Sequence, residues 1–516
     1  MTDPIAPIAV LLAPAYDHGE YLAAESLGLR SVAAVLHKAG AQVHVFDECL
    51  NPPPEHIVAL ARQATFVGIG VLFTRQTPDA IELARSLRSQ APGAYFMIGG
   101  QGLQFLWEDV LTDCREIDSA CLYEGEETIL EVWARLLANA DHTDIKGLVT
   151  READGSIKTA GPRPPSVTLD DLPFAYRDPS SNSYRGGHAT MSTSRGCAAH
   201  CTFCQSGNYA NRYHKMPKWR HRGARSVVDE ITHLHETYGV DMISFVDDDF
   251  LGGKGQGRGR AEDFIRLVRE LPFGITFSIE CRVDEVDREI LTALRKVGLR
   301  NVLIGIESAI EADIQLFAKK TTNQQVEAAI DLLRDLNIDF STGFITFHPT
   351  SNLEGIAENL TFLARNRITN YRRLTNRLEL YPGSPLLRYY ERRGVAMYVD
   401  RYRVYYEFAD PRIATLYHAM RDLLADYQEL ESACAIEKFR ASRGGDPRAF
   451  ERLAELLRLS DSVSSSMIEN ARKCLAKVQS SGNDASFDEV RASVGEERSR
   501  LTSVLQRTVL AQAPTV

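Results

Sequence analysis

The sequence predicts an α/β protein that ends in a helical region, and three observations lead to this fold class. Short apolar runs alternate with amphipathic helical stretches over residues 1–140, and the same alternation returns over residues 187–394. Pro, Gly and polar residues interrupt it over residues 141–186, and the strand signal disappears over residues 395–516. Apolar strands joined by helices are typical of parallel sheets covered on both faces. We therefore expect a doubly wound N-terminal domain, a linker, a second βα domain and a C-terminal helical domain.

The amino-acid composition indicates a globular protein and argues against several classes of binding partner. The 516 residues carry a net charge of −10, with 44% hydrophobic and 25% charged residues. This balance is typical of a globular protein, and its acidic sign argues against broad binding to nucleic acid or anionic membranes. No apolar stretch approaches the roughly 18 residues of a membrane-spanning helix. The apolar run 5–15 has no basic residue before it, so we expect a buried first strand, not a signal peptide, and a cytoplasmic protein.

The N-terminal elements follow from their apolar spacing. Strands are expected at residues 7–12, 42–46, 66–72, 94–98 and 119–122, and helices at 21–39, 55–62, 77–89, 105–111 and 127–138. Such a sheet binds its ligands beyond the carboxyl ends of the strands. In the linker, Asp154 and Gly155 predict a hairpin turn.

Residues 187–394 contain six βα units, which predict a partial barrel. Strands are expected at 190–193, 242–246, 275–280, 301–306, 339–346 and 377–380, and helices at 226–238, 261–271, 285–297, 324–336, 353–365 and 385–392. Chemistry in such barrels sits at the carboxyl ends of the strands. Further helices are expected at 411–430, at 447–457 and from 464 onward.

Three of the nine cysteines lie close together after the first barrel strand, as Cys197, Cys201 and Cys204. Three thiolates can hold three irons of a 4Fe-4S cluster and leave the fourth iron open for a substrate. A zinc site completed by His200 or His214 is an alternative, and so is a structural cluster with a remote fourth ligand.

The C-x₃-C-x-aromatic-C pattern, with Phe203 before the last cysteine, resembles the radical S-adenosylmethionine (SAM) superfamily. Similar motifs follow at later strand ends: the acidic turn Asp247–Asp249, Cys281-Arg282-Val283-Asp284, Gly305-Ile306-Glu307-Ser308 and Tyr381-Pro382-Gly383-Ser384. The resemblance implies that the open iron binds SAM, whose cleavage gives a 5′-deoxyadenosyl radical. It also implies a set of SAM-binding residues: Phe203, Asp247, Asp248, Arg282 and Glu307.

Two positions depart from this family pattern. Ala198-Ala199 replaces the usual Pro-Phe, and His348-Pro349-Thr350-Ser351 replaces a glycine-rich fifth turn. We consider His348 as a catalytic residue that faces the substrate or carries a proton, with a structural loop histidine as the alternative.

The N-terminal domain resembles the Rossmann-like cobalamin-binding domain of class B radical SAM enzymes. Four segments carry this resemblance: 26–29, 67–70, 98–101 and 124–128. It implies that cobalamin is held by Phe73, Thr74, Arg75, Gly99, Gly100, Gln101, Glu124 and Gly125. Glycines at the strand ends would let the backbone approach a flat ligand.

The lower face of the cobalt is expected to lack a histidine. None of the 13 histidines belongs to a D-x-H-x-x-G motif, so Phe73 or Arg75 would lie below the cobalt. A degenerate domain that binds no cobalamin is the alternative.

These resemblances imply a cobalamin-dependent radical SAM enzyme, which we expect to methylate an unactivated carbon of a small metabolite. An external electron donor of the flavodoxin or ferredoxin type would reduce the cluster. A non-methylating cyclisation, rearrangement or oxidation is the second hypothesis. A metal-stabilised RNA-binding protein is the third, because segment 209–225 mixes basic and aromatic residues. Methylthiotransferases are set aside, because the N-terminal cysteines lack the spacing that those enzymes need.

Overall fold

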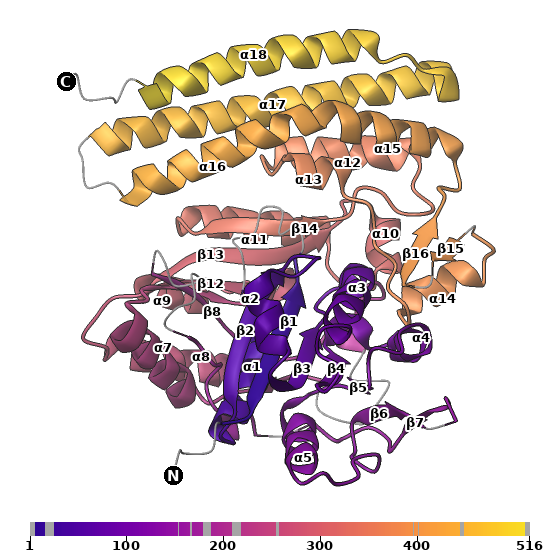
Figure 1. The fold of residues 1–516 in the computed structure, drawn as a ribbon. Coiled ribbons are helices and arrows are strands. Elements are labelled where there is room, and N and C mark those ends of the chain that lie inside the picture. The colour runs from indigo at the N-terminus through magenta and orange to yellow at the C-terminus, as the bar shows by residue number, and fades with distance from the viewer. Residues whose placement is uncertain are drawn as a thin grey trace.

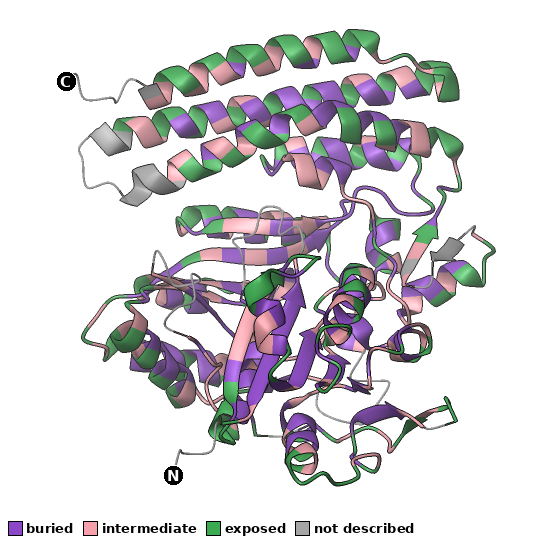
Figure 2. Cartoon of the chain, in the orientation of Figure 1, coloured by how far each residue is buried: buried purple, intermediate pink, exposed green. Residues whose placement is uncertain are grey.

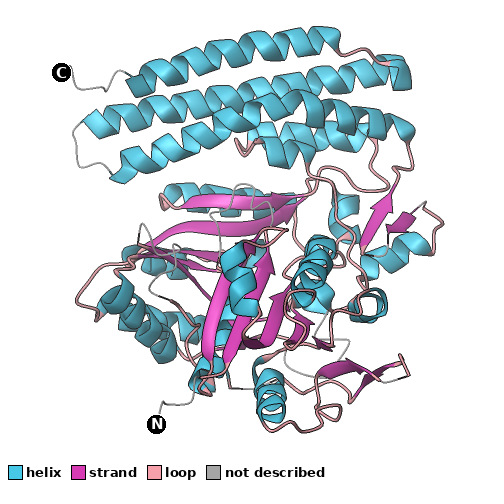
Figure 3. Ribbon diagram, in the orientation of Figure 1, coloured by secondary structure: helices cyan, strands magenta, loops and turns pink. Residues whose placement is uncertain are grey.

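The computed structural model describes residues 6–15, 25–152, 154–165, 168–178, 187–208, 218–253, 257–395, 397–400, 402–443 and 448–510. The N-terminal sheet packs beside the barrel, and long C-terminal helices form a separate layer over the barrel (Figure 1). The predicted fold class is confirmed: two α/β units are followed by a helical region (Figure 3).

The N-terminal sheet has the strand order β2-β1-β3-β4-β5-β6-β7, and β1 to β5 are parallel. Its parallel strands are β1 (Ile8–Pro14), β2 (Gln42–Cys49), β3 (Ala64–Gly70), β4 (Tyr95–Gly99) and β5 (Ser119–Cys121). Its helices are α1 (Leu27–Lys38), α2 (Glu55–Ala61), α3 (Thr77–Arg88), α4 (Trp107–Asp113) and α5 (Glu126–Leu137). Helices α1 and α5 pack on one face, and α2, α3 and α4 on the other, so the sheet is doubly wound as predicted.

The range expected to be a linker contains ordered structure. Strands β6 (Leu148–Arg151) and β7 (Ile157–Thr159) form the predicted hairpin and add to the sheet edge, antiparallel to β5. Gly155 occupies the turn with φ +85°, a conformation that favours glycine. Further along, Leu169 and Arg177 are buried, so this segment is a packed strap between the two α/β units.

The barrel sheet has five parallel strands in the order β14-β13-β12-β11-β8. They are β8 (His188–Met191), β11 (Met242–Phe245), β12 (Thr276–Arg282), β13 (Leu299–Glu307) and β14 (Asp339–Phe344). The accompanying helices are α7 (Ala224–Tyr238), α8 (Arg258–Arg269), α9 (Arg288–Lys296), α10 (Glu311–Leu316), α11 (Asn323–Asp335), α12 (Leu353–Arg365), α13 (Tyr371–Thr375) and α14 (Pro385–Glu391).

The sixth barrel strand, expected at 377–380, is not a regular strand. It joins the sheet through one parallel bridge between Phe347 and Arg377. The side chain of Asn376 donates to the Phe344 carbonyl at 2.6 Å and so takes a backbone acceptor at the sheet edge. Pro382, which has no N–H to donate, follows soon after. At this edge the five-stranded sheet is therefore continued by a loop with one bridge, not by a sixth regular strand.

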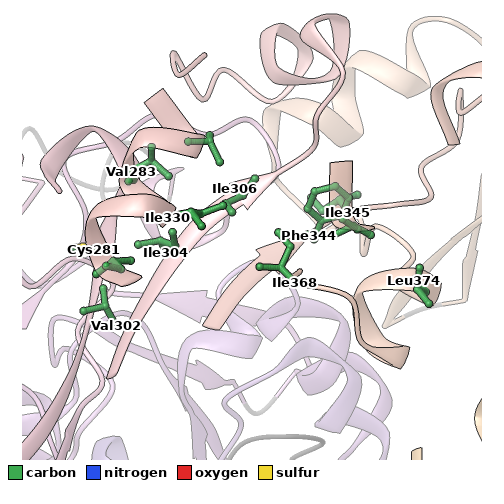
Figure 4. Packing of buried hydrophobic residues seen from close by; sticks show 14 of the residues in the cluster. Cys281, Val283, Val302, Ile304, Ile306, Ile330, Phe344, Ile345, Ile368 and Leu374 are labelled. Atoms are coloured by element: carbon green, nitrogen blue, oxygen red, sulfur yellow. The ribbon is translucent and has the colours of Figure 1, made fainter. Parts of the chain in front are cut away.

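Buried and partly exposed side chains alternate along the strands, so each strand has a core face and a polar face. Val302, Ile304 and Ile306 of β13 lie in the hydrophobic layer with Ile330 of α11 (Figure 4). On β12, burial alternates residue by residue, so Glu280 projects to the opposite, polar face. Figure 2 shows mainly buried and intermediate residues on the strands, and exposed residues mainly on the helices. The polar face carries the site described below.

The C-terminal region contains a strand pair that the sequence did not predict, β15 (Met397–Asp400) and β16 (Arg403–Tyr406). It is followed by α15 (Pro411–Leu424), α16 (Gln428–Arg443), α17 (Arg448–Ser481) and α18 (Asp488–Leu510). These helices lie over α12 and α13 on the outside of the barrel (Figure 1). Among the described residues, no helix is both long and apolar enough to cross a membrane.

Candidate active site

The three-cysteine loop begins directly after a two-residue strand, β9 (Ser194–Arg195), which pairs with β10 (Arg220–His221). Gly196 adopts φ +80°, and a Cβ there would lie 2.1 Å from the Lys218 carbonyl oxygen. Only glycine fits this turn without moving the neighbouring segment. The turn directs the chain from the strand into the loop.

Side chains and backbone groups fix the cysteine loop in place. The Asn208 side chain donates to the carbonyl oxygens of Cys201 and Cys204 at 2.9 and 2.7 Å. Thr202 donates through its hydroxyl to the Leu316 carbonyl at 2.6 Å. Phe203 packs edge-on against Phe317 at 5.5 Å, so it holds the loop against the barrel.

The three thiols are free and suited to bind a cluster. Burial, the largest influence, raises the pKa of Cys197 to about 12 and raises that of Cys204, so cluster binding must displace their protons. The three cysteines lie on one short loop, and a cube binds one cysteine at each of three irons, so the cysteine loop fits a 4Fe-4S cluster.

Asp247 holds the segment that precedes the cysteine loop. Its carboxylate accepts from the Thr193 N–H at 2.7 Å, the Thr193 hydroxyl at 2.8 Å and the Ser194 N–H at 2.5 Å. Burial, the largest influence, raises the pKa of this carboxyl although Arg260 acts in the opposite direction. The residue is 1% exposed. Its geometry therefore suits positioning of the loop, which differs from the direct contact with SAM that the resemblance implies.

Asp248 is placed differently. Its side chain is solvent-exposed, yet surrounding protein atoms, the largest influence, raise the pKa of its carboxyl. Glu280, which the sequence analysis missed, lies within electrostatic range. Burial, and then Asp248 and Asp247, raise the pKa of Glu280 to about 8. The period-two burial on β12 could have indicated this residue, since it places Glu280 and Arg282 on the same face.

Arg282 reaches the cysteine loop from the end of β12. Its guanidinium pairs with Asp284 at 2.9 Å, donates to the Lys319 carbonyl at 3.1 Å and lies 4.0 Å from the Cys201 sulfur. These contacts bring a fixed positive charge next to the expected cluster.

Glu307 is held in a strained and buried position at the end of β13. Its φ is +71°, a conformation that is uncommon outside glycine. Its carboxylate pairs with the Lys319 ammonium at 3.2 Å, and both residues are buried. A Cβ at Gly305 would lie 2.6 Å from both groups, and a Cβ at Gly343 would lie 3.1 Å from the carboxylate. The two glycines therefore leave room for this ion pair.

His348 has a structural setting. Its two ring nitrogens lie 3.1 Å from Asp313 and 3.1 Å from the Tyr390 hydroxyl, and the residue is 4% exposed. Asp313 in turn accepts from the Ser308 hydroxyl at 2.9 Å. Such burial differs from the substrate-facing role considered for His348 and favours the structural alternative.

The glycines of the N-terminal strand ends serve loop packing. A Cβ at Gly100 would lie 2.3 Å from the Val71 carbonyl oxygen, and a Cβ at Gly102 would lie 2.6 Å from the Phe73 backbone. Gly99 would contact Cys121 at 3.3 Å. The spaces beside Gly99 and Gly100 are filled by protein, whereas the resemblance implies that these two glycines contact cobalamin.

The loop after β3 contributes exposed side chains at this edge. Leu72 is 44% exposed, Arg75 is exposed, and the Arg75 guanidinium lies over the Phe73 ring at 5.0 Å. Thr74 is buried and donates to the Gly102 carbonyl at 3.3 Å, so it supports the loop. An exposed leucine beside an arginine–aromatic pair fits the flat, largely apolar face of a corrin.

Glu124 lies at the interface between the two α/β units, whereas a Cβ at Gly125 would lie 3.3 Å from Val32 within the N-terminal unit. Glu124 pairs with Arg220 and with Arg195 at 3.3 Å, and Glu126 pairs with Arg195 at 2.5 Å. Arg195 comes two residues before Cys197, so these carboxylates fix the N-terminal domain to the cysteine loop. This role differs from the cobalamin contact that the resemblance implies.

The basic and aromatic segment 209–225 is described only in part. Tyr209, Arg212, Tyr213 and Lys215 lie outside the described residues, as does His214. Of the remainder, Trp219 donates its indole N–H to the Asp249 carbonyl at 2.8 Å, and Arg222 pairs with Glu230 at 2.5 Å. These side chains are engaged within the protein.

Comparison with known proteins identifies both α/β units. Residues 191–363 match the model of the Radical SAM superfamily, and residues 21–132 match the model of the B12 binding domain.

Three relatives illustrate the range of similar proteins. An uncharacterized methyltransferase of Pyrococcus horikoshii is 26% identical over 350 residues, which cover 64% of this chain and 74% of that protein. The anaerobic magnesium-protoporphyrin IX monomethyl ester cyclase of Synechocystis is 28% identical over 324 residues, covering 60% and 62%. Cytidylyl-2-hydroxyethylphosphonate methyltransferase of Streptomyces wedmorensis is 26% identical over 379 residues, covering 63% and 69%.

Solved structures share the fold. The cobalamin-dependent SAM radical enzyme OxsB, with aqua-cobalamin and SAM bound, has a TM-score of 0.73 at 18% identity and covers 98% of this chain and 80% of its own. The radical SAM methyltransferase TsrM, with cobalamin and a [4Fe-4S] cluster bound, has a TM-score of 0.62 at 17% identity, covering 77% and 76%. The chain therefore contains a B12-binding domain joined to a radical SAM domain, and it shares the fold of cobalamin-dependent radical SAM enzymes.

Proposed function

We propose that this enzyme is a C-methyltransferase that acts on an unactivated carbon of a small molecule. The observation that carries the proposal is that the carboxyl edge of the N-terminal sheet meets the cysteine end of the barrel. Gln101, after β4, donates to Ser206 of the barrel at 2.7 Å, and a Cβ at Gly383 would lie 2.2 Å from the Phe105 ring. A substrate between these edges would face both cofactors.

Each group of residues has a distinct task in this proposal. Cys197, Cys201 and Cys204 hold the cluster, and Asp248, Arg282 and Glu307 orient SAM beside it. Leu72, Phe73 and Arg75 form the surface against which cobalamin would rest. When bound, the cofactors supply radical generation and a transferable methyl group, and the protein supplies placement and exclusion of water.

Relatives that are named methyltransferases support methyl transfer. The cyclase among them favours the second candidate, a non-methylating radical reaction on the same cofactors. A polar barrel face that carries Asp248 and Glu280 suits a polar small molecule. We further propose an external one-electron donor of the flavodoxin or ferredoxin type, and a cytoplasmic location in which the free thiols stay reduced.

Labelled SAM tests the proposal. Protein reconstituted anaerobically with iron, sulfide and hydroxocobalamin is incubated with methyl-deuterated SAM and a reductant, and the corrin is analysed by mass spectrometry. The proposal predicts a deuterated methyl group on cobalamin and an equal amount of S-adenosylhomocysteine. 5′-Deoxyadenosine without corrin labelling would favour the non-methylating reaction. Neither product, together with RNA affinity that falls steeply with salt, would favour the RNA-binding hypothesis.

A further inference from the structure

The cysteine loop reaches the protein surface at His200. This residue is exposed, whereas the next one, Cys201, is buried. The Thr202 N–H donates to the Phe317 carbonyl at 3.1 Å, and the Thr202 carbonyl accepts from the Leu386 N–H at 3.0 Å. The loop is therefore held between the segment that follows α10 and the start of α14, and it stays open to solvent at His200.

The segments beside this loop carry positive side chains at the surface. Lys320 is exposed in the segment that follows α10, and Arg388 is exposed on α14. Lys218 is partly exposed, and its ammonium lies 2.7 Å from Nδ1 of His200. We call Lys218, Lys320 and Arg388 the basic rim. Its three cations come from three separate segments that lie beside the cysteine loop.

Acidic residues are absent from these segments, although the whole chain is acidic. Residues 197–208, 218–222, 314–326 and 380–390 contain no Asp or Glu, whereas the chain has 69 acidic against 59 basic residues. The basic rim is therefore a local reversal of the overall charge. Opposite charges on two proteins steer their encounter and fix their orientation. The surface around the cysteine loop thus suits a negatively charged partner.

The basic rim also lies close to the place where the cluster is expected. The carbonyl of Lys319, the residue before Lys320, accepts from the Arg282 guanidinium at 3.1 Å. The same guanidinium lies 4.0 Å from the Cys201 sulfur. A partner that contacts Lys320 would therefore be separated from a cluster ligand by few protein groups. Complexes that transfer electrons bury little surface, so charge contributes much to how they form.

We propose that the basic rim is the docking surface for an acidic protein that carries one electron. The inference rests on the proposed function, in which an external donor reduces the cluster before SAM is cleaved. The docked carrier loses one electron and the cluster gains it, and no bond forms or breaks in this step. RNA also binds to positive surfaces. The three cations lie beside the loop that carries the cluster ligands, which favours a redox partner over RNA.

The test uses the full-length protein with its reconstituted cluster, and flavodoxin, a small acidic one-electron donor, as the probe. Stopped-flow absorption measures the rate at which reduced flavodoxin reduces the cluster at several salt concentrations. Calorimetry measures the dissociation constant of oxidised flavodoxin, which does not depend on activity. The variants are Arg388→Glu alone and Lys218→Glu combined with Lys320→Glu. The matched control combines Lys38→Glu with Lys296→Glu, because both residues are exposed in the last turns of α1 and α9, away from the carboxyl ends of the strands.

At low salt, flavodoxin should reduce the variant with Lys218→Glu and Lys320→Glu about tenfold more slowly than the wild type. This variant should also bind flavodoxin more weakly, and its rate should depend less on salt. Arg388→Glu should show the same changes to a smaller extent. The control variant should behave as the wild type does. All variants should be reduced at the wild-type rate by photoreduced 5-deazaflavin, a small molecule that needs no docking surface.

Wild-type rates and affinity for flavodoxin in the variant with Lys218→Glu and Lys320→Glu would overturn the docking surface but leave the proposed function intact. The same holds for a wild-type protein that 5-deazaflavin reduces and flavodoxin does not. Loss of affinity for a poly(U) oligonucleotide in that variant, with flavodoxin unaffected, would overturn the inference in favour of RNA. A wild-type protein whose cluster neither reagent reduces would contradict the proposed function and the inference together.

Discussion

At this site, buried side chains of opposite charge form ion pairs that are largely shielded from water. Glu307 and Lys319 are 9% and 5% exposed, and each supplies the counter-charge of the other. Burial alone would lower the pKa of Lys319, but Glu307 and then Cys201 reverse this effect and raise it. Removing one partner leaves an uncompensated buried charge, whereas removing both charges need not destabilise the fold.

Lys319→Met should therefore lower the free energy of unfolding by about 3–5 kcal/mol, as expected when a buried pair is broken. The double variant Glu307→Gln with Lys319→Met should recover most of this loss but bind SAM weakly, because the carboxylate is absent. Urea unfolding and SAM dialysis measure the two effects. Full SAM affinity in the double variant would contradict the assignment of Glu307.

His348→Gln tests the structural setting of that histidine. Loss of the bonds to Asp313 and Tyr390 should cost about 1–3 kcal/mol of stability. The rate of 5′-deoxyadenosine formation per reconstituted cluster should stay within about twofold of wild type, since His348 does not touch the reacting groups. A folded, cluster-loaded variant with a hundredfold slower rate would restore His348 as a catalytic residue.

Residue roles could be predicted from sequence only where the chemistry is local. The cysteine spacing indicated the cluster because its ligands lie on one loop. Gln101 and Ser206 could not be paired, because their contact depends on how two domains meet. Asp247 and Glu124 are predicted ligand contacts because strand-end carboxylates look alike in sequence, and their contacts with Thr193 and Arg195 could not be predicted from it.

Helices and strands were predicted correctly where apolar residues recur with a regular spacing. Helix α12 begins and ends at the predicted residues, since its apolar face is regular and Asn352 caps its start. The prediction of a sixth barrel strand was wrong, because the Asn376 side chain donates to the Phe344 carbonyl at the sheet edge. The β15–β16 hairpin was missed because its strands are only four residues long.

The turn into the cysteine loop gives a prediction at this scale. Gly196→Ala forces a side chain into a left-handed conformation and against the Lys218 carbonyl, so iron bound per chain should fall by more than half. Gly259→Ala in α8 is the matched control, because its Cβ meets nothing within 4 Å, and it should bind iron as the wild type does. Equal iron content in both variants would show that the turn does not shape the loop.

The whole molecule depends on a buried ionic network that joins the two α/β units. Arg177, in the strap, pairs with Glu25 at 3.1 Å and Glu230 at 2.9 Å, and it donates to the Thr190 carbonyl at 2.6 Å. Glu25 belongs to the N-terminal unit, whereas Thr190 and Glu230 belong to the barrel. The network therefore aligns the sheet edges on which the proposed function depends.

Arg177→Met should destabilise the protein by about 3–5 kcal/mol and separate thermal unfolding into two transitions, because the domains lose their shared charge. The exposed pair of Arg266 and Asp263, at 3.0 Å, supplies the control. Arg266→Met should change stability by less than about 1 kcal/mol. A single unshifted transition for Arg177→Met, measured by calorimetry, would argue against domain alignment by this network.

In the proposed function, one chain holds both cofactors and uses SAM in two ways. The most direct measurement is the nucleoside output of anaerobically reconstituted protein with SAM and a reductant, recorded with its absorption spectrum. We predict corrin and iron–sulfur bands, with both 5′-deoxyadenosine and S-adenosylhomocysteine formed. Cys201→Ala should keep the corrin bands but form no 5′-deoxyadenosine. A wild-type protein that retains no corrin, or forms 5′-deoxyadenosine at the level of Cys201→Ala, would contradict the account.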